Sequence, residues 1–411
     1  AGAALDLLLG VALLVMSTAG MRRALRAALA SLVLLALIVS AVPLDVRRMA
    51  SGVYRHGVAS WPADAEVLFH ADGKTASVDV LGTGGGKRTI LTNGKPDAAI
   101  GPLDRAPSPD EATMVLLGAV PLALHPEARR VANIGFGSGL TTATLLADPR
   151  LERVDTIEIE ARMVEGARQF LPRVARAYDD PRSRIVIDDA KTWFAARNTR
   201  YDLIVSEPSN PWVSGVASLF SVEFYTMVSR YLAEDGLLVQ WLQLYEFDTR
   251  LLASVIEALT TRFPHYAIYQ TDDSNLFIVA HRTRVPESPS ARLFETPAMA
   301  AELERVGVRE VADMRALRVA SVHVLEPFFA SYHAPRNSDY RPYLDQHAPR
   351  ARFLRHNAGA VLALRNAPLP LLEMLEHAPP TEAALASGDT HAAARRRRAA
   401  LATLAALVEG G

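Results

Sequence analysis

The stretch Arg130-Val-Ala-Asn-Ile-Gly-Phe-Gly-Ser-Gly139 decides the fold of this chain. Its first five residues form an apolar run typical of a buried strand, and a helical pattern begins at residues 141–146. Gly135, Gly137 and Gly139 lie between the two, where glycine allows a sharp turn and a close approach of the backbone to a ligand beside a helix N-terminus. A plain tight turn explains the glycines nearly as well when they are considered alone, so the surrounding sequence has to decide.

Strands and helices alternate around this turn between residues 125 and 283. Such alternation is typical of βαβ units and a parallel sheet. We therefore predict an α/β fold with a doubly wound, mostly parallel sheet over residues 123–285. Further strands are expected at residues 154–159, 185–187, 203–206, 237–241 and 275–280.

Acidic side chains follow three of these expected strands. Glu158 closes the second strand about 20 residues after the glycines, where a carboxylate can accept hydrogen bonds from ribose hydroxyls. Asp189 precedes Ala190 after the third strand, and Glu207 follows the fourth in a loop stiffened by prolines. The carboxyl ends of parallel strands meet at one edge, where open α/β sheets bind ligands. A nucleoside site is expected there, and the spacing leaves open whether a dinucleotide or an adenosyl compound fills it.

A small antiparallel β-region is predicted before this sheet, within residues 50–122. The β-rich stretches at residues 66–70, 76–81 and 88–92 are broken by Asp72-Gly73, by residues 82–86 and by Asn93-Gly94, and Asp-Gly and Asn-Gly are hairpin signals. A helix is expected from Pro109. Residues 286–411 resemble helices and loops, with an Ala-rich helical tail at residues 383–408.

Residues 1–43 are far more apolar than the rest of the chain. Two runs, residues 3–20 and 27–42, are joined by a link that carries Arg22, Arg23 and Arg26, and each is close to the length that crosses a bilayer. We predict two membrane-spanning helices at the end of a longer membrane region. A buried helical hairpin is the alternative.

Composition excludes several classes of function. The chain has 411 residues, with 44 Lys and Arg against 45 Asp and Glu, so the net charge is 44 − 45 = −1. A balanced charge gives no support for nucleic-acid binding. Cysteine is absent, which removes disulfides, Cys-ligated zinc, iron–sulfur clusters and a Cys nucleophile. No metal is expected.

Together these motifs resemble the spermidine synthase family, the polyamine aminopropyltransferases, over residues 61–281, with a weaker match at residues 337–345. The chain looks most like the branch in which transporter-like helices precede that domain. The resemblance implies the class I S-adenosylmethionine methyltransferase fold and transfer of an aminopropyl group from decarboxylated S-adenosylmethionine to an amine or polyamine. It implies a catalytic role for Glu207, ribose binding by Glu158, adenine binding by Asp189 with Ala190, and a loop on the methionine side formed by Gly135, Gly137, Ser138 and Gly139.

The acceptor side is expected to be acidic, because a diamine is doubly cationic. The candidates are Asp104, Asp110, Glu111, Asn210 and Tyr245. Ser138 and Asn210 stand where the family carries aspartates, so two other functions stay open: a methyltransferase that uses S-adenosylmethionine itself, and a non-catalytic nucleoside- or polyamine-sensing domain. Because the nucleoside is made in the cytoplasm, we expect an inner-membrane protein whose catalytic domain faces that compartment. The acceptor, and whether the chain forms a homodimer, stay open.

Overall fold

The computed structural model describes residues 6, 9–10, 12–13, 21–41, 45–53, 57, 61 and 64–362. The chain divides into two units, Ala1–Trp61 and Pro62–Gly411. The first unit contains α2 (Met21–Ala41) and α3 (Val46–Met49). Trp61 closes it, because its indole nitrogen donates to the carbonyl oxygen of Ala50 over 2.8 Å.

Helix α2 does not support the predicted membrane span at residues 27–42. It begins at Met21 and therefore takes Arg22, Arg23 and Arg26 into its first two turns. The charge-free part that follows rises about 22 Å, less than the roughly 30 Å of a bilayer core. Among the described residues, no helix has the length and apolar character needed to cross a membrane. Most of the first expected span, residues 3–20, lies outside the described residues.

A four-stranded antiparallel sheet opens the second unit, with the strands paired in chain order. Asn93 and Gly94 have φ of 50° and 74°, as a tight hairpin turn requires, and they confirm the hairpin that the sequence predicted. The fourth strand was not predicted, because it begins with the polar run Lys95-Pro-Asp97. The strands are β1 (Ala65–Asp72), β2 (Ser77–Thr83), β3 (Arg88–Thr92) and β4 (Lys95–Ile100).

An eight-stranded sheet forms the centre of the same unit, in the order β12-β10-β11-β9-β8-β5-β6-β7. The run from β7 to β9 is parallel throughout, whereas β11 is antiparallel to both of its neighbours. The mixed α/β fold with a large, parallel-rich sheet is therefore confirmed. The strands are β5 (Arg130–Ile134), β6 (Arg153–Glu158), β7 (Ser183–Ile187), β8 (Tyr201–Ser206), β9 (Leu232–Gln243), β10 (His265–Gln270), β11 (Asn275–His281) and β12 (Arg318–Ser321).

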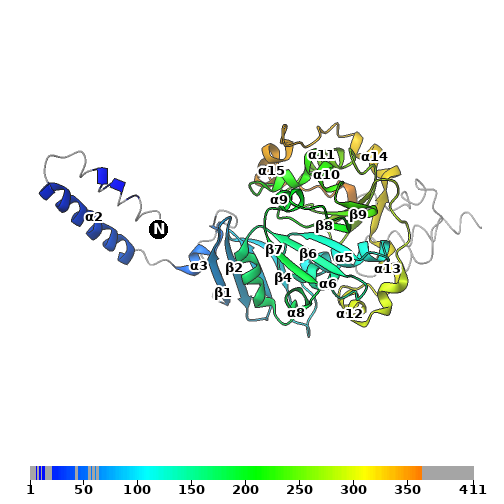
Figure 1. Ribbon diagram of the computed structural model, residues 1–411, viewed down its shortest axis with the longest axis horizontal. Helices are drawn as coiled ribbons and strands as arrows, with labels where there is room; N and C mark the ends of the chain where they lie inside the picture. Colours follow the sequence, from blue (N-terminus) through cyan, green and yellow to red (C-terminus); the bar gives the residue numbers. More distant parts are fainter. Residues whose placement is uncertain are drawn as a thin grey trace, which may run out of the picture. The chain divides into compact units, whose positions relative to one another are not determined.

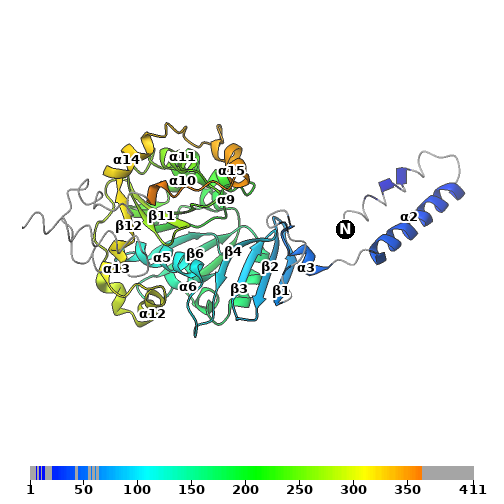
Figure 2. The same ribbon diagram turned by 180° about the vertical axis from the view of Figure 1, so that it is seen from behind.

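Helices cover both faces of this sheet, as Figures 1 and 2 show. One core joins Ile204 to α9, α10, α11, α14 and α15, and the other joins the adjacent Leu203 to α5, α6, α7 and α12. Neighbouring residues of a strand point to opposite faces, so both faces of β8 are buried. The helices are α5 (Pro109–Leu124), α6 (Leu140–Leu145), α7 (Ala161–Gly166), η1 (Ala167–Phe170), α8 (Ala175–Asp179), α9 (Ala190–Ala195), η2 (Val216–Phe220), α10 (Val222–Val228), α11 (Thr249–Leu259), η3 (Ala291–Glu295), α12 (Pro297–Arg305), α13 (Val311–Ala316), α14 (Val322–Ala330) and α15 (Tyr343–Phe353).

The region after residue 285 differs from the prediction in one element. Helices α12 to α15 agree with it, but β12 adds a short edge strand beside β10. The expected tail at residues 383–408 lies outside the described residues.

Candidate active site

The site lies where the strand order reverses, because β5 has β6 on one side and β8 on the other. Gly135 follows β5 with φ of 96°, and a Cβ there would collide with the carbonyl oxygen of Glu207. The amide of Glu207 donates to the carbonyl oxygen of Ile134 over 2.9 Å. Gly137 has φ of 52° and open space where a side chain would be. Glycine is therefore required at residue 135 by close packing of two backbones, and at residue 137 by conformation alone.

Glu158 stands at the end of β6, as predicted, and holds the glycine loop. Its carboxylate accepts hydrogen bonds from the amides of Phe136 and Glu160, each over 2.9 Å. Burial raises the pKa of Glu158, opposed by those backbone donors, and the charge of Asp97 raises it further. The carboxylate is thus fixed at the sheet edge beside the glycines.

Asp189 and Ala190 lie at the neighbouring strand end, after β7. The Asp189 carboxylate accepts a hydrogen bond from the Thr192 amide over 2.8 Å and so caps α9, while Ala190 is buried. Two apolar residues at this edge were missed: Ile159 is 52% exposed and Ile187 is 50% exposed. Large aliphatic side chains beside acidic residues at strand ends suit the face of a planar ring, and this position in the sequence is the signal that could have found them.

Glu207 follows β8 and is held by Thr141, the second residue of α6. The Thr141 hydroxyl donates to the Glu207 carboxylate over 2.6 Å. Burial raises the pKa of Glu207 to about 7, the Thr141 hydrogen bond opposes this, and the charge of Asp110 adds to it. A carboxylate that titrates near neutral pH is suited to accept a proton during a reaction. Thr141 is a second residue that the sequence did not single out.

Lys95, Asp97 and Ser209 form a polar cluster that includes the loop carrying Glu207, and the sequence predicted none of the three. Lys95 is only 5% exposed, and its ammonium group pairs with Asp97. It also donates to the Ser209 hydroxyl over 3.0 Å, and Ser209 donates to the same Asp97 oxygen over 3.0 Å. Strand β4 and the loop after β8 thereby meet at one polar contact.

Comparison with known proteins identifies the central part of this unit. Residues 112–272 match the family model for the spermine/spermidine synthase domain. This segment belongs to that family. The chain is 34% identical over 156 residues to the polyamine aminopropyltransferase of Moorella thermoacetica, covering 38% of the chain and 55% of that relative. It is 30% identical over 145 residues to that of Desulforudis audaxviator, covering 35% and 52%. The chain spans about half the length of the curated relatives it matches.

A solved structure, the spermidine synthase of Thermotoga maritima, is 22% identical with a TM-score of 0.45, covering 53% of the chain and 72% of that structure.

The charge of Asp110 acts on Glu207, whereas the neighbouring Glu111 is turned into the interior. Burial raises the pKa of Asp110, an amide hydrogen bond at Ala99 opposes this, and the charge of Asp272 adds to it. Glu111 is fully buried, and its carboxylate accepts hydrogen bonds from the amides of Gly101 and Ser108. The expectation that Glu111 binds the acceptor is corrected, because its side chain has no exposed surface and its carboxylate is held in an ion pair with Arg305.

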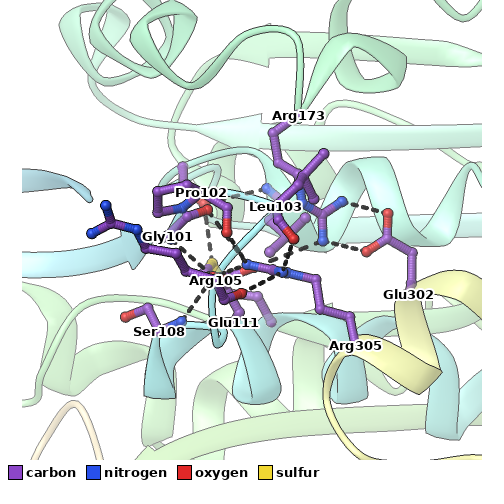
Figure 3. Close-up of polar contacts among 12 residues, drawn as sticks. Gly101, Pro102, Leu103, Arg105, Ser108, Glu111, Arg173, Glu302 and Arg305 are labelled. Atoms are coloured by element: carbon purple, nitrogen blue, oxygen red, sulfur yellow. Dashed lines mark hydrogen bonds and ion pairs between the residues drawn. The ribbon is translucent and has the colours of Figure 1, made fainter. Parts of the chain in front are cut away.

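Arg305 of α12 is the main partner of Glu111, as Figure 3 shows. Its Nε donates to Glu111 over 2.8 Å, and one terminal nitrogen donates to the carbonyl oxygen of Pro102 over 3.0 Å. Arg173 lies 3.8 Å from the same carboxylate and pairs with Glu302. The network fixes the loop between β4 and α5.

The other expected site residues differ in burial and in the residues that they contact. Asn210 is fully buried, and its amide donates to the Tyr245 hydroxyl over 3.4 Å, so these two lie together. Ser138 is fully buried as well, and its hydroxyl contacts the sulfur of Met114 at 3.0 Å. Asp104 is exposed in the loop before α5. The geometry brings Asn210 and Tyr245 together beside the loop that carries Glu207, and it directs Ser138 into the core.

Proposed function

We propose that this chain is an aminopropyltransferase that moves the aminopropyl group of decarboxylated S-adenosylmethionine to an amine. The family of residues 112–272 and the names of the relatives support this class. The observation that carries the proposal is Glu207, a carboxyl group with a pKa of about 7 beside the glycine loop of a parallel-rich sheet. A base with this pKa is half ionised near neutral pH, where an amine has to lose its proton.

The chemistry is a displacement at a carbon activated by a positive sulfur. The acceptor ammonium first gives a proton to the Glu207 carboxylate and becomes a neutral amine. The amine lone pair then forms a bond to the methylene carbon beside sulfur, the carbon–sulfur bond breaks, and its electron pair neutralises the sulfur of the departing methylthioadenosine. The protein therefore contributes alignment and proton removal.

The nucleoside half of the donor is proposed to lie across the strand ends. Glu158 would face the ribose, Asp189 and Ala190 the adenine edge, and Gly135, Gly137 and Gly139 the methionine-derived chain. Ile159 and Ile187 would cover the faces of the adenine ring. All of these belong to the carboxyl ends of β5, β6 and β7 or to the loops that follow them.

Product analysis tests this function. The purified chain is incubated with decarboxylated S-adenosylmethionine and an amine, and mass spectrometry follows methylthioadenosine and an acceptor heavier by one aminopropyl group. A parallel reaction contains S-adenosylmethionine. Methylated acceptor in that second reaction would replace the proposal with a methyltransferase. Binding of either nucleoside without any product would favour a sensing domain.

We also propose that the synthase domain works in the cytoplasm, because S-adenosyl nucleosides are made there. A reporter fused after Gly411 should give a cytoplasmic signal in a bacterial host. A periplasmic signal would remove this donor as the substrate.

A further inference from the structure

A buried lysine bonded to the loop that carries the candidate base needs an explanation. Lysine is rarely buried unless it is paired, and Lys95 is 5% exposed at the first position of β4. Its ammonium group has two partners, the Asp97 carboxylate and the Ser209 hydroxyl. Ser209 is two residues after Glu207. The cation is therefore held on the loop that carries the base.

Lys95 neutralises one of three carboxylates that would otherwise attract amines. Asp97, Asp110 and Glu207 come from β4, α5 and the loop after β8, and the charge of Asp110 acts on Glu207. Lys95 pairs directly with Asp97, and its charge also acts on Asp110. Lys87, which is exposed, acts on Asp110 as well. One carboxylate of the three thus already has a permanent cation.

The ion pair between Lys95 and Asp97 uses only one of the two Asp97 carboxylate oxygens. Asp97 Oδ2 is buried and accepts no hydrogen bond from any residue that the structure describes. A buried carboxylate oxygen without a donor is costly, so a bound N–H group would stabilise it. Lys95 and Ser209 both contact the other oxygen, Oδ1, and leave Oδ2 for such a donor.

We propose that Lys95 determines acceptor specificity: it provides a built-in ammonium group, so that the site takes an amine with one positive charge in preference to a diamine. The inference rests on the proposed aminopropyl transfer. A monoamine needs only the ion pair and proton acceptor that Asp110 and Glu207 supply. The open Oδ2 belongs to a carboxylate whose charge the Lys95 cation already neutralises. The distal ammonium of a diamine would therefore be repelled by Lys95 at short range there, in surroundings where charges are poorly screened, whereas an uncharged N–H donor would not.

The test compares n-butylamine with putrescine, two acceptors of equal carbon length. Turnover is measured as methylthioadenosine release, and binding is measured by calorimetry in the presence of methylthioadenosine. The unmodified chain should favour butylamine by about tenfold or more, the effect of about 1.4 kcal/mol. Lys95→Gln should shift the preference toward putrescine by about the same factor, and Lys95→Arg should keep it. Thermal unfolding confirms that each variant is folded.

The matched control is Lys87→Gln, which removes a positive charge that acts on the same Asp110 from an exposed position. It should change the preference by less than about threefold, because solvent screens exposed charges. An equal shift in Lys87→Gln, an unchanged ratio in Lys95→Gln, or a preference for putrescine in the unmodified chain would each overturn the assignment. If no amine is turned over but the binding preference moves with Lys95, aminopropyl transfer fails while the role of Lys95 stands. If Lys95→Gln does not fold, the preference of the unmodified chain for butylamine over putrescine still tests the proposal.

Discussion

Glu207 gains its suitability as a base from burial. Because desolvation raises its pKa to about 7, with the Thr141 hydroxyl opposing the shift, the group is half ionised near neutral pH. We predict that kcat/KM rises with pH through an apparent pKa near 7, since only the carboxylate accepts a proton. Glu207→Gln should lower turnover at least about 100-fold and leave nucleoside affinity unchanged. Glu234→Gln, at an exposed position of β9, is the matched control. Retained turnover in Glu207→Gln would remove the base from the mechanism.

Glu207 should also lower the stability of the fold at high pH. A carboxyl group whose pKa is raised by folding binds its proton more tightly in the folded state, so the contribution of Glu207 to stability is lost as pH rises from about 4.5 through about 7. Glu207→Gln cannot ionise and avoids this loss. We predict that its thermal midpoint exceeds that of the unmodified chain near pH 8 and that the two agree near pH 4. A difference between the two midpoints that does not change with pH would contradict the raised pKa.

At the scale of elements, Arg305 joins α12 to the start of α5 and to the loop between β4 and α5. Its side chain is 11% exposed beside the fully buried Glu111. Removing one partner of a buried ion pair costs about 3–5 kcal/mol, and here the lower end of about 3 kcal/mol is expected because Arg173 stays 3.8 Å from the Glu111 carboxylate. We predict this loss in the free energy of unfolding by urea for Arg305→Leu. Arg309→Leu, whose pair with Glu304 is exposed, should cost less than about 1 kcal/mol. Equal costs would show that the buried pair adds nothing beyond a surface one.

Local chemistry explains which elements the sequence could predict. The turn at Gly135 and the hairpin at Asn93-Gly94 follow from conformations that few residues tolerate, and both are found. The position of Glu158 and Glu207 at strand ends follows from the strand pattern. Contacts between distant residues could not be predicted: Glu111 meets Arg305 across 194 positions, and the Lys95–Ser209 contact spans 114. The role expected for Glu111 was wrong for that reason.

At the scale of the whole molecule, the two units differ in how far their apolar side chains are buried. The unit Pro62–Gly411 buries its apolar residues in two cores on the faces of one sheet. Helix α2 of the other unit has six large apolar side chains that are more than half exposed: Leu25, Leu29, Leu32, Val33, Leu34 and Leu37. Large apolar side chains that stay exposed along a helix are typical of a segment that binds a partner or a lipid surface.

This contrast gives a prediction about detergent dependence. A chain that starts at Pro62 should stay monodisperse without detergent, keep its thermal midpoint within about 2 °C, and keep its nucleoside affinity, because its core and candidate site lie within one compact unit. The 411-residue chain should need detergent or lipid vesicles to stay dispersed, because α2 exposes its apolar side chains. A matched variant with Leu29, Val33 and Leu37 changed to Gln tests the cause, since it keeps the length of α2 and removes apolar surface. Size-exclusion chromatography with light scattering compares the three proteins. If the 411-residue chain is monodisperse without detergent, the prediction that α2 causes detergent dependence is wrong.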